Sequence, residues 1–132
     1  MPTQKKLLIF IVMLLMLAGC GGSSGSPADA IEAYLQALVA KDQDQLVNYS
    51  CVDWEEQAII ELDSLVTVTA ELQDLQCKEA SQVNTDALVD CSGKIVFNYN
   101  GELQELDLST RQYVAREEDG QWRMCGYIYF DH

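Results

Sequence analysis

Two hairpin turns organise the stretch NYNGELQELDLSTRQYVAREEDGQWRMCGYIYF, residues 98–130. Asn100-Gly101 and Asp119-Gly120 are dipeptides that favour the tight turns joining antiparallel strands. Between and after these turns, apolar side chains alternate with polar ones, as in strands that bury one face. The stretch therefore predicts consecutive strands of an antiparallel sheet.

The residues before this stretch predict two more strands, because residues 66–77 and 87–97 also alternate with a period of two. Gln73-Asp74 breaks the alternation in the first of them, which indicates a β-bulge. The meander is completed by the strand between the two turns, with Leu106, Leu108 and Val114 on one face, and by an aromatic-rich strand from Trp122 to Phe130.

Two helices are expected before the strands. Ser26-Pro27 has the character of a helix start, with a capping hydroxyl and a proline in the first turn. The helix that follows presents an apolar stripe made of Ile31, Tyr34, Leu35, Leu38 and Val39. A second helix is expected from about Asp53, as its N-terminal cap, to Leu65, with Trp54, Ala58, Ile59, Leu62 and Leu65 on one face and Glu61 among the surface acids.

The expected fold class is therefore α+β: two N-terminal helices packed on a curved four-stranded antiparallel sheet. The domain spans residues 27–132, a length that suits one domain with a modest core.

The N-terminal segment is typical of an export signal. Lys5 and Lys6 precede an apolar run from Leu7 to Ala18. The run is shorter than the roughly 20 apolar residues that a membrane-spanning helix needs. We therefore expect a signal peptide and not a permanent transmembrane anchor.

Leu17-Ala18-Gly19-Cys20 resembles the lipobox of bacterial lipoproteins, in which small residues precede an acylated cysteine. The resemblance implies that residues 1–19 are a lipoprotein signal peptide and that Cys20 becomes the lipidated first residue. Residues 20–26 would then be the lipidated cysteine plus a Gly/Ser tether, which is flexible by composition. The protein would be attached to the cell membrane on its extracytoplasmic side. The alternative is an ordinary signal peptide with a chance cysteine.

The charge excludes one class of partner. The chain has eight basic and 21 acidic residues, and removal of residues 1–19 leaves six basic and 21 acidic ones, a net charge of −15. Such a chain repels nucleic acid and anionic lipid headgroups, so we expect no nucleic-acid binding, and membrane attachment through the Cys20 lipid alone. The acidity serves either solubility or an acidic recognition face.

Four cysteines remain after Cys20, and export places them in an oxidising compartment. A hairpin turn centred on Asn84 would set Cys77 directly opposite Cys91, within bridging distance. In the same registers Cys125 lies too far from Cys91 to pair with it. Cys51 and Cys125 would then form the second disulfide, joining the helices to the last strand.

A metal site is the competing interpretation of these cysteines. It would need clustered thiol or imidazole ligands at short spacings. The sequence has no CxxC motif, and its one histidine is His132. We therefore expect no metal and no cofactor.

The closing Asp119-Gly120-Gln121-Trp122-Arg123-Met124 segment, after helices and long strands, is similar to the NTF2-like superfamily. The resemblance covers residues 27–130 and is closest to small lipoprotein versions, including domains of unknown function. It implies an NTF2-like, or cystatin-like, cone between sheet and helices that holds a small ligand or is simply filled. Some enzymes of the superfamily place Asp, His or Tyr in this cone as acid or base.

Catalytic residues are not evident in this chain. Asp90 and Asp107 alternate with apolar neighbours and should point away from the core, and no internal histidine is present. We therefore expect no enzyme and assign no catalytic residue. Candidate pocket-lining residues are Tyr34, Trp54, Tyr113 and Trp122, which can equally be core residues.

The function expected from sequence is a lipid-anchored extracytoplasmic lipoprotein with a small non-catalytic domain that binds a protein partner or a small apolar ligand. One alternative is a small-molecule enzyme, isomerase-like or cyclase-like, that uses the cone. Another is a structural envelope component. A pocket that holds a carboxylate near Tyr or Trp would favour the enzyme, and a filled core would exclude it.

Overall fold

The computed structural model describes residues 25–130. The expected signal peptide, Cys20 and His132 lie outside the described residues. Within residues 25–130, no helix is long and apolar enough to span a membrane.

Three α-helices, two 3-10 turns and five strands make up the described chain. In chain order they are α2 (Pro27–Ala40), α3 (Gln43–Asn48), η1 (Val52–Trp54), α4 (Glu55–Ser64), β1 (Thr69–Val83), β2 (Asp86–Tyr99), β3 (Glu102–Asp107), η2 (Leu108–Thr110), β4 (Arg111–Glu118) and β5 (Gln121–Tyr129). Ser26 caps α2 as expected, because its hydroxyl accepts a hydrogen bond from the Asp29 N–H at 3.1 Å.

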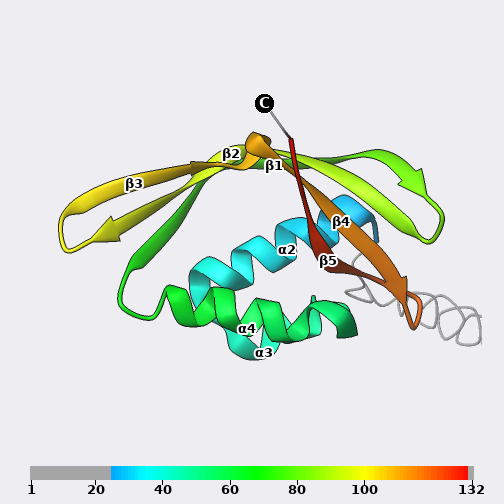
Figure 1. The fold of residues 1–132 in the computed structure, drawn as a ribbon, viewed down its shortest axis with the longest axis horizontal. Helices are drawn as coiled ribbons and strands as arrows, with labels where there is room; N and C mark the ends of the chain where they lie inside the picture. The colour runs from blue at the N-terminus through cyan, green and yellow to red at the C-terminus, as the bar shows by residue number, and fades with distance from the viewer. Residues whose placement is uncertain (1–24, 131–132) are drawn as a thin grey trace, which may run out of the picture.

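The fold has two layers, a curved antiparallel sheet and a layer of helices that covers one of its faces (Figure 1). The strand order is β1-β2-β4-β5, and β3 pairs with the end of β2 that β4 leaves uncovered. The long β1–β2 hairpin and the β2–β3 hairpin extend in opposite directions, with α2 running beneath the sheet between them (Figure 1). This arrangement leaves a cone between the sheet and the helices.

The expected numbers of helices and strands were wrong. Three α-helices are present in the described chain instead of two, because Lys41 takes a left-handed conformation that ends α2 and Asp42 caps α3. Five strands are present in place of four, because the 3-10 turn η2 divides the strand between the two hairpin turns into β3 and β4. The α+β class and the antiparallel sheet are confirmed.

Splitting that strand also changes which side chains face the helices. Leu108 is fully buried, as predicted, but beyond η2 the buried side chains are Tyr113 and Ala115. Val114, expected on the buried face, points to the opposite side of β4. The turn also shifts the pairing of β2 with β4 by one residue relative to the pairing of β2 with β3. As a result, Asp90 pairs with Gln112.

The predicted bulge in β1 is confirmed. The pairing of β1 with β2 shifts between Gln73 and Gln76, and Asp74 has a φ of 55°. Gly93 of β2 lies against the bulge with a φ of 95°. A Cβ atom at Gly93 would lie 2.5 Å from both the Asp74 and the Gln73 carbonyl oxygens. The bulge therefore requires glycine on the facing strand.

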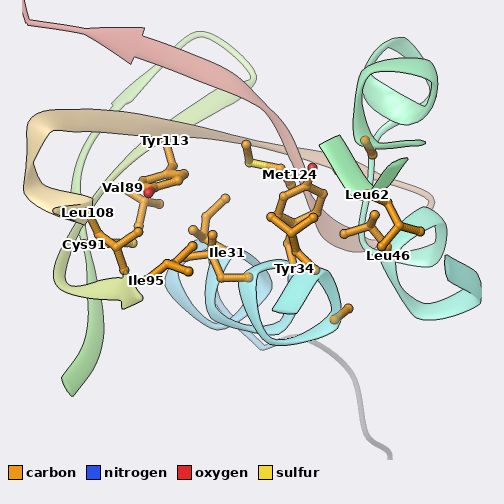
Figure 2. Close-up of a cluster of buried hydrophobic side chains, with 14 of the residues drawn as sticks. Ile31, Tyr34, Leu46, Leu62, Val89, Cys91, Ile95, Leu108, Tyr113 and Met124 are labelled. Carbon is orange, nitrogen blue, oxygen red and sulfur yellow. The ribbon is translucent and has the colours of Figure 1, made fainter. Parts of the chain in front are cut away.

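The hydrophobic core lies between α2 and the sheet. Figure 2 shows Ile31 and Tyr34 rising from α2, with Val89, Cys91, Ile95, Leu108 and Tyr113 around the first and Met124 beside the second. Tyr34 and Tyr113 are the largest fully buried side chains. The predicted helix stripe thus packs on the predicted sheet face.

Two disulfides tie the layers and the first hairpin together, with the pairing expected from the sequence. Cys77 and Cys91 face each other across β1 and β2, and their Cα atoms are 4.1 Å apart. Cys51 and Cys125 have Cα atoms 5.3 Å apart and connect the segment before η1 to β5. The backbone reinforces this second connection, since the Cys51 N–H donates to the Met124 carbonyl at 2.8 Å. The two disulfides indicate an oxidising, extracytoplasmic compartment.

Candidate functional site

A cavity of about 180 Å³ occupies the cone between the sheet and the helices. Its wall is mostly apolar, with side chains from helices and strands alike. The apolar lining is Leu35, Leu38, Leu65, Ile95, Phe97, Leu106 and Leu108, and the polar lining is Glu61, Ser64, Arg111, Tyr113 and Tyr127. Ser64 is exposed and Leu106 is half-buried, so the cavity reaches the surface between α4 and β3.

Glu61 of α4 is the carboxylate of this cavity. Its Oε2 atom accepts a hydrogen bond from the Tyr34 hydroxyl at 2.7 Å and another from the Tyr127 hydroxyl at 3.0 Å. The Trp54 indole N–H donates to the Tyr34 oxygen at 3.1 Å, which orients the Tyr34 hydroxyl toward Glu61. The other oxygen, Oε1, accepts no hydrogen bond from the described residues. One oxygen of the carboxylate is thus fixed by two tyrosine hydroxyls, and the other makes no hydrogen bond within residues 25–130.

The environment of Glu61 changes its acidity. Burial raises the pKa of Glu61 above its ordinary value of 4.5 and outweighs the hydrogen bonds from Tyr34 and Tyr127 and the positive charge of Arg111, which all act to lower it. Burial also raises the pKa of Tyr127 well above its ordinary value, and that of Tyr113 to about 12. The tyrosines therefore remain protonated donors at neutral pH.

The raised pKa of Glu61 predicts an unusual pH dependence of stability. The folded state holds the Glu61 proton more tightly than the unfolded state, so the contribution of Glu61 to stability falls as the pH rises from 4.5 through the raised pKa. The melting temperature of the wild type, relative to Glu61→Gln, should therefore increase as the pH is lowered from 7 toward 4.5. Glu56→Gln, which removes an exposed carboxylate from the same helix, controls for the charge. A difference that is constant or decreases would contradict the prediction.

Aromatic rings enclose one side of the cavity. Tyr127 makes edge-to-face contacts with Trp54 and with Tyr113, at centroid distances of 5.2 and 5.3 Å. The Arg111 guanidinium lies over the Tyr127 ring, 4.5 Å from its centroid, and 5.7 Å from the centroid of Tyr129. Tyr127 thus contacts both charged residues of the cavity, Arg111 through its ring and Glu61 through its hydroxyl.

Two polar atoms beside the cavity have no partner. The Tyr113 hydroxyl and the Arg111 Nε atom are both buried, and neither forms a hydrogen bond within the described chain. An unpaired buried donor costs about 1–3 kcal/mol, so such atoms are uncommon in folded proteins. These two donors are the polar atoms of the cavity lining that are buried without a hydrogen-bond partner in residues 25–130.

A second hollow adjoins the first on the other side of Arg111. It has a volume of about 730 Å³ and is lined in part by the Cys77–Cys91 disulfide, Glu32 and Phe130. Glu32 is already engaged, because it accepts the Cys77 backbone N–H at 2.8 Å. Arg111 lines both hollows.

The four candidate pocket residues have different positions. Tyr113 lines the cavity. Tyr34 donates a hydrogen bond to Glu61, and Trp54 donates one to Tyr34, so these two residues fix the orientation of the carboxylate. Trp122 packs against the core near the start of β5 and is not part of the cavity wall. Three of the four candidates thus lie at the site, and its charged residue Glu61 was not among the candidates.

Two expectations about acidic residues were wrong. Glu61, expected on the surface, faces the cone. It follows Ala58 by three residues and precedes Leu65 by four, a spacing that places it on the apolar face of α4. Asp53, expected as a helix cap, instead accepts a hydrogen bond from Arg116 at 3.0 Å, and no side chain caps α4. Asp90 and Asp107 lie outside the cavity, as expected.

Metal-ligating side chains do not gather in the described part of the chain: no three His, Cys, Asp or Glu residues come together as a metal-binding group there. All four cysteines between residues 25 and 130 are in disulfides.

The comparison with known proteins identifies similar folds among solved structures. No family model matches the sequence, and no curated protein matches it. Among solved structures, a SEC-C motif-containing protein from Rhodopseudomonas palustris superposes with a TM-score of 0.60 and 16% identity, covering 83% of this chain and 82% of that one.

Two further structures have the same architecture. A Pseudomonas putida protein proposed to be a polyketide cyclase gives a TM-score of 0.53 at 12% identity, covering 80% of this chain and 92% of its own. A ketosteroid isomerase-like protein from Erwinia carotovora gives 0.50 at 17% identity, covering 74% and 87%. The chain therefore has an NTF2-like, ketosteroid isomerase-like fold.

Proposed function

We propose that this domain binds a small molecule in the cone between its sheet and its helices. The observation that carries the proposal is the cavity itself, an apolar wall with a carboxylate whose Oε1 atom is free. Ligand sites combine an apolar lining with a few placed polar groups in this way. A purely structural domain would gain stability by filling the cavity with side chains.

The size of the cavity limits its ligand. At about 180 Å³, it is smaller than the usual range for drug-sized ligands, roughly 300–1,000 Å³. An apolar cavity of about 150 Å³ is sufficient for benzene. The ligand, or the part of it that enters the cone, should therefore be about the size of one ring.

Filling the cavity provides the test. Benzyl alcohol should bind with a dissociation constant on the order of 1 mM and shift the NMR signals of Leu35, Leu106 and Tyr113. Leu106→Trp would place an indole in the cavity and should weaken binding more than about tenfold. Leu103→Trp is the matched control, because Leu103 is on the same strand but 65% exposed. Equal binding by both variants, or shifts confined to other residues, would contradict the proposal.

Acid–base catalysis is a second candidate, and the free Oε1 atom of Glu61 together with its raised pKa favours it. A general base must reach the proton it removes and needs a pKa near the working pH. The domain should then accelerate hydrogen–deuterium exchange next to the carbonyl of cyclopentanone, and Glu61→Gln should abolish the acceleration. A domain that only binds its ligand would give equal exchange rates with and without Glu61.

We further propose that Cys20 is acylated and holds the domain at the extracytoplasmic side of the membrane. Lipidation needs the thiol, so Cys20→Ala should abolish incorporation of labelled palmitate in bacteria and leave the precursor unprocessed. Cys51→Ala, which breaks the Cys51–Cys125 disulfide and keeps Cys20, is the control and should keep the label. Continued labelling of the Cys20→Ala protein would refute the assignment.

A further inference from the structure

Arg111 forms no ion pair within residues 25–130, although the chain is rich in acids. The sequence has 21 acidic and eight basic residues, and Lys94 and Arg116 both form ion pairs. No nitrogen of Arg111 lies within 4.0 Å of a carboxylate oxygen among the described residues. The Arg111 guanidinium instead lies over the faces of the Tyr127 and Tyr129 rings. The guanidinium is thus positioned by stacking, with its N–H groups unused.

The free donors of Arg111 and Tyr113 adjoin the same cavity. Arg111 Nε is buried without an acceptor, and so is the Tyr113 hydroxyl. Both residues line the cone, and the two side chains are close enough for the positive charge of Arg111 to act on the pKa of Tyr113. A group with two acceptor oxygens would satisfy both side chains, since a guanidinium binds a carboxylate through two parallel hydrogen bonds.

We propose, on the basis of the binding site proposed above, that the ligand is a small monocarboxylate with an apolar body. Its carboxylate accepts hydrogen bonds from the Arg111 guanidinium and the Tyr113 hydroxyl, and its body contacts the leucines of the cone. Arg111 lines both hollows, so the carboxylate lies where they adjoin.

The charge of Glu61 allows the sign of a change in ligand affinity to be predicted. Its carboxylate lines the same cavity as Arg111 and repels an anionic ligand, so removing its charge should strengthen carboxylate binding. A cationic ligand would behave in the opposite way, because Glu61 would attract it and Arg111 would repel it. The two variants Glu61→Gln and Arg111→Gln therefore change affinity in opposite directions, and the signs identify the charge of the ligand.

The experiment compares benzoate with benzyl alcohol, which has a similar size and no charge, by calorimetric titration at pH 7. Benzoate should bind the wild type about tenfold more tightly, as expected for charge-assisted hydrogen bonds. Arg111→Gln should remove that advantage, so that benzoate and benzyl alcohol bind with similar affinity, and the remaining binding of benzyl alcohol shows that the variant is folded. Glu61→Gln should raise benzoate affinity. Lys94→Gln, which removes an exposed lysine outside the cone, should leave both affinities unchanged.

The possible failures are separable. If benzyl alcohol binds and benzoate binds no more tightly, or if Arg111→Gln leaves the preference intact, the carboxylate inference is wrong and the binding site stands. If Glu61→Gln weakens benzoate while Arg111→Gln strengthens it, the inference is also wrong. If neither probe binds the wild type, the proposed function itself fails.

Discussion

Replacing Cys51 and Cys125 together by alanine is expected to lower the free energy of unfolding by about 4 kcal/mol. The disulfide closes a loop with a sequence separation of 74 residues, and restriction of the unfolded chain increases with loop length. It also joins the helical layer to β5 next to the bridge between Ser50 and Met124, where two backbone hydrogen bonds connect the layers. Urea denaturation of the oxidised domain would measure the loss.

The Cys77–Cys91 disulfide is the internal control for this prediction. Its sequence separation is 14, and the hairpin hydrogen bonds of β1 and β2 already hold the two residues opposite each other. The double alanine variant at Cys77 and Cys91 should therefore lose less, at most about 3 kcal/mol. A larger loss from this pair than from Cys51 and Cys125 would contradict the role assigned to the longer bridge.

Gly93→Ala should be the most damaging single substitution in the sheet, with a loss of about 3 kcal/mol or more. The new methyl group would meet two backbone carbonyl oxygens of the β1 bulge at 2.5 Å, and neither can move without breaking the bulge. The positive φ of Gly93 adds strain of its own. Thermal and urea unfolding of the variant would give the value.

Gly101→Ala separates these two causes. Gly101 also has a positive φ, of 96°, but no atom lies within 4 Å of a Cβ at that position. It should lose only about 1 kcal/mol, the cost of the backbone conformation. Equal losses at Gly93 and Gly101 would mean that the bulge does not press on Gly93 in solution.

Turn chemistry made much of the sheet predictable. Asn100-Gly101 and Asp119-Gly120 fix short hairpins, in which Tyr99 pairs with Glu102 and Glu118 with Gln121 on either side of the two-residue turns. The Cys77–Cys91 pair was also predicted correctly, although the turn is not centred on Asn84: Val83 pairs with Asp86, and a register shift between Glu79 and Ser81 brings Cys77 opposite Cys91. Local sequence determines these features because a two-residue turn leaves the flanking strands a single favourable register.

The division of β3 from β4 was not predictable from alternation alone. Leu106 and Leu108 suit a continuous strand, and the alternation of apolar and polar residues gives no sign that the chain turns after Leu108. The 3-10 turn forms because Asp107 accepts hydrogen bonds from both the backbone and the hydroxyl of Ser109, at 2.9 and 2.7 Å. The resulting shift of one residue brings Arg111 and Tyr113, and not Val114, to the face that lines the cone.

The site was harder to predict than the fold. Tyr34, Trp54 and Tyr113 were identifiable from the sequence as aromatic residues of the core. The charged residue that they lie near, Glu61, was not identified as part of the site. Glu61 occupies a place on the apolar stripe of α4, which is the one local sign of its position. That a buried carboxylate is tolerated there depends on the hydroxyls of Tyr34 and Tyr127, which come from elements 27 and 66 residues away in the sequence.

The most direct test of the central claim, that the cone binds a small molecule, is a crystal structure of the domain grown with benzyl alcohol. The account predicts density for the ring between Leu35, Leu106 and Tyr113, with its hydroxyl toward Glu61 or Arg111. A cone filled by Phe97 and Leu106, with no ligand density at a concentration well above the measured dissociation constant, would contradict it.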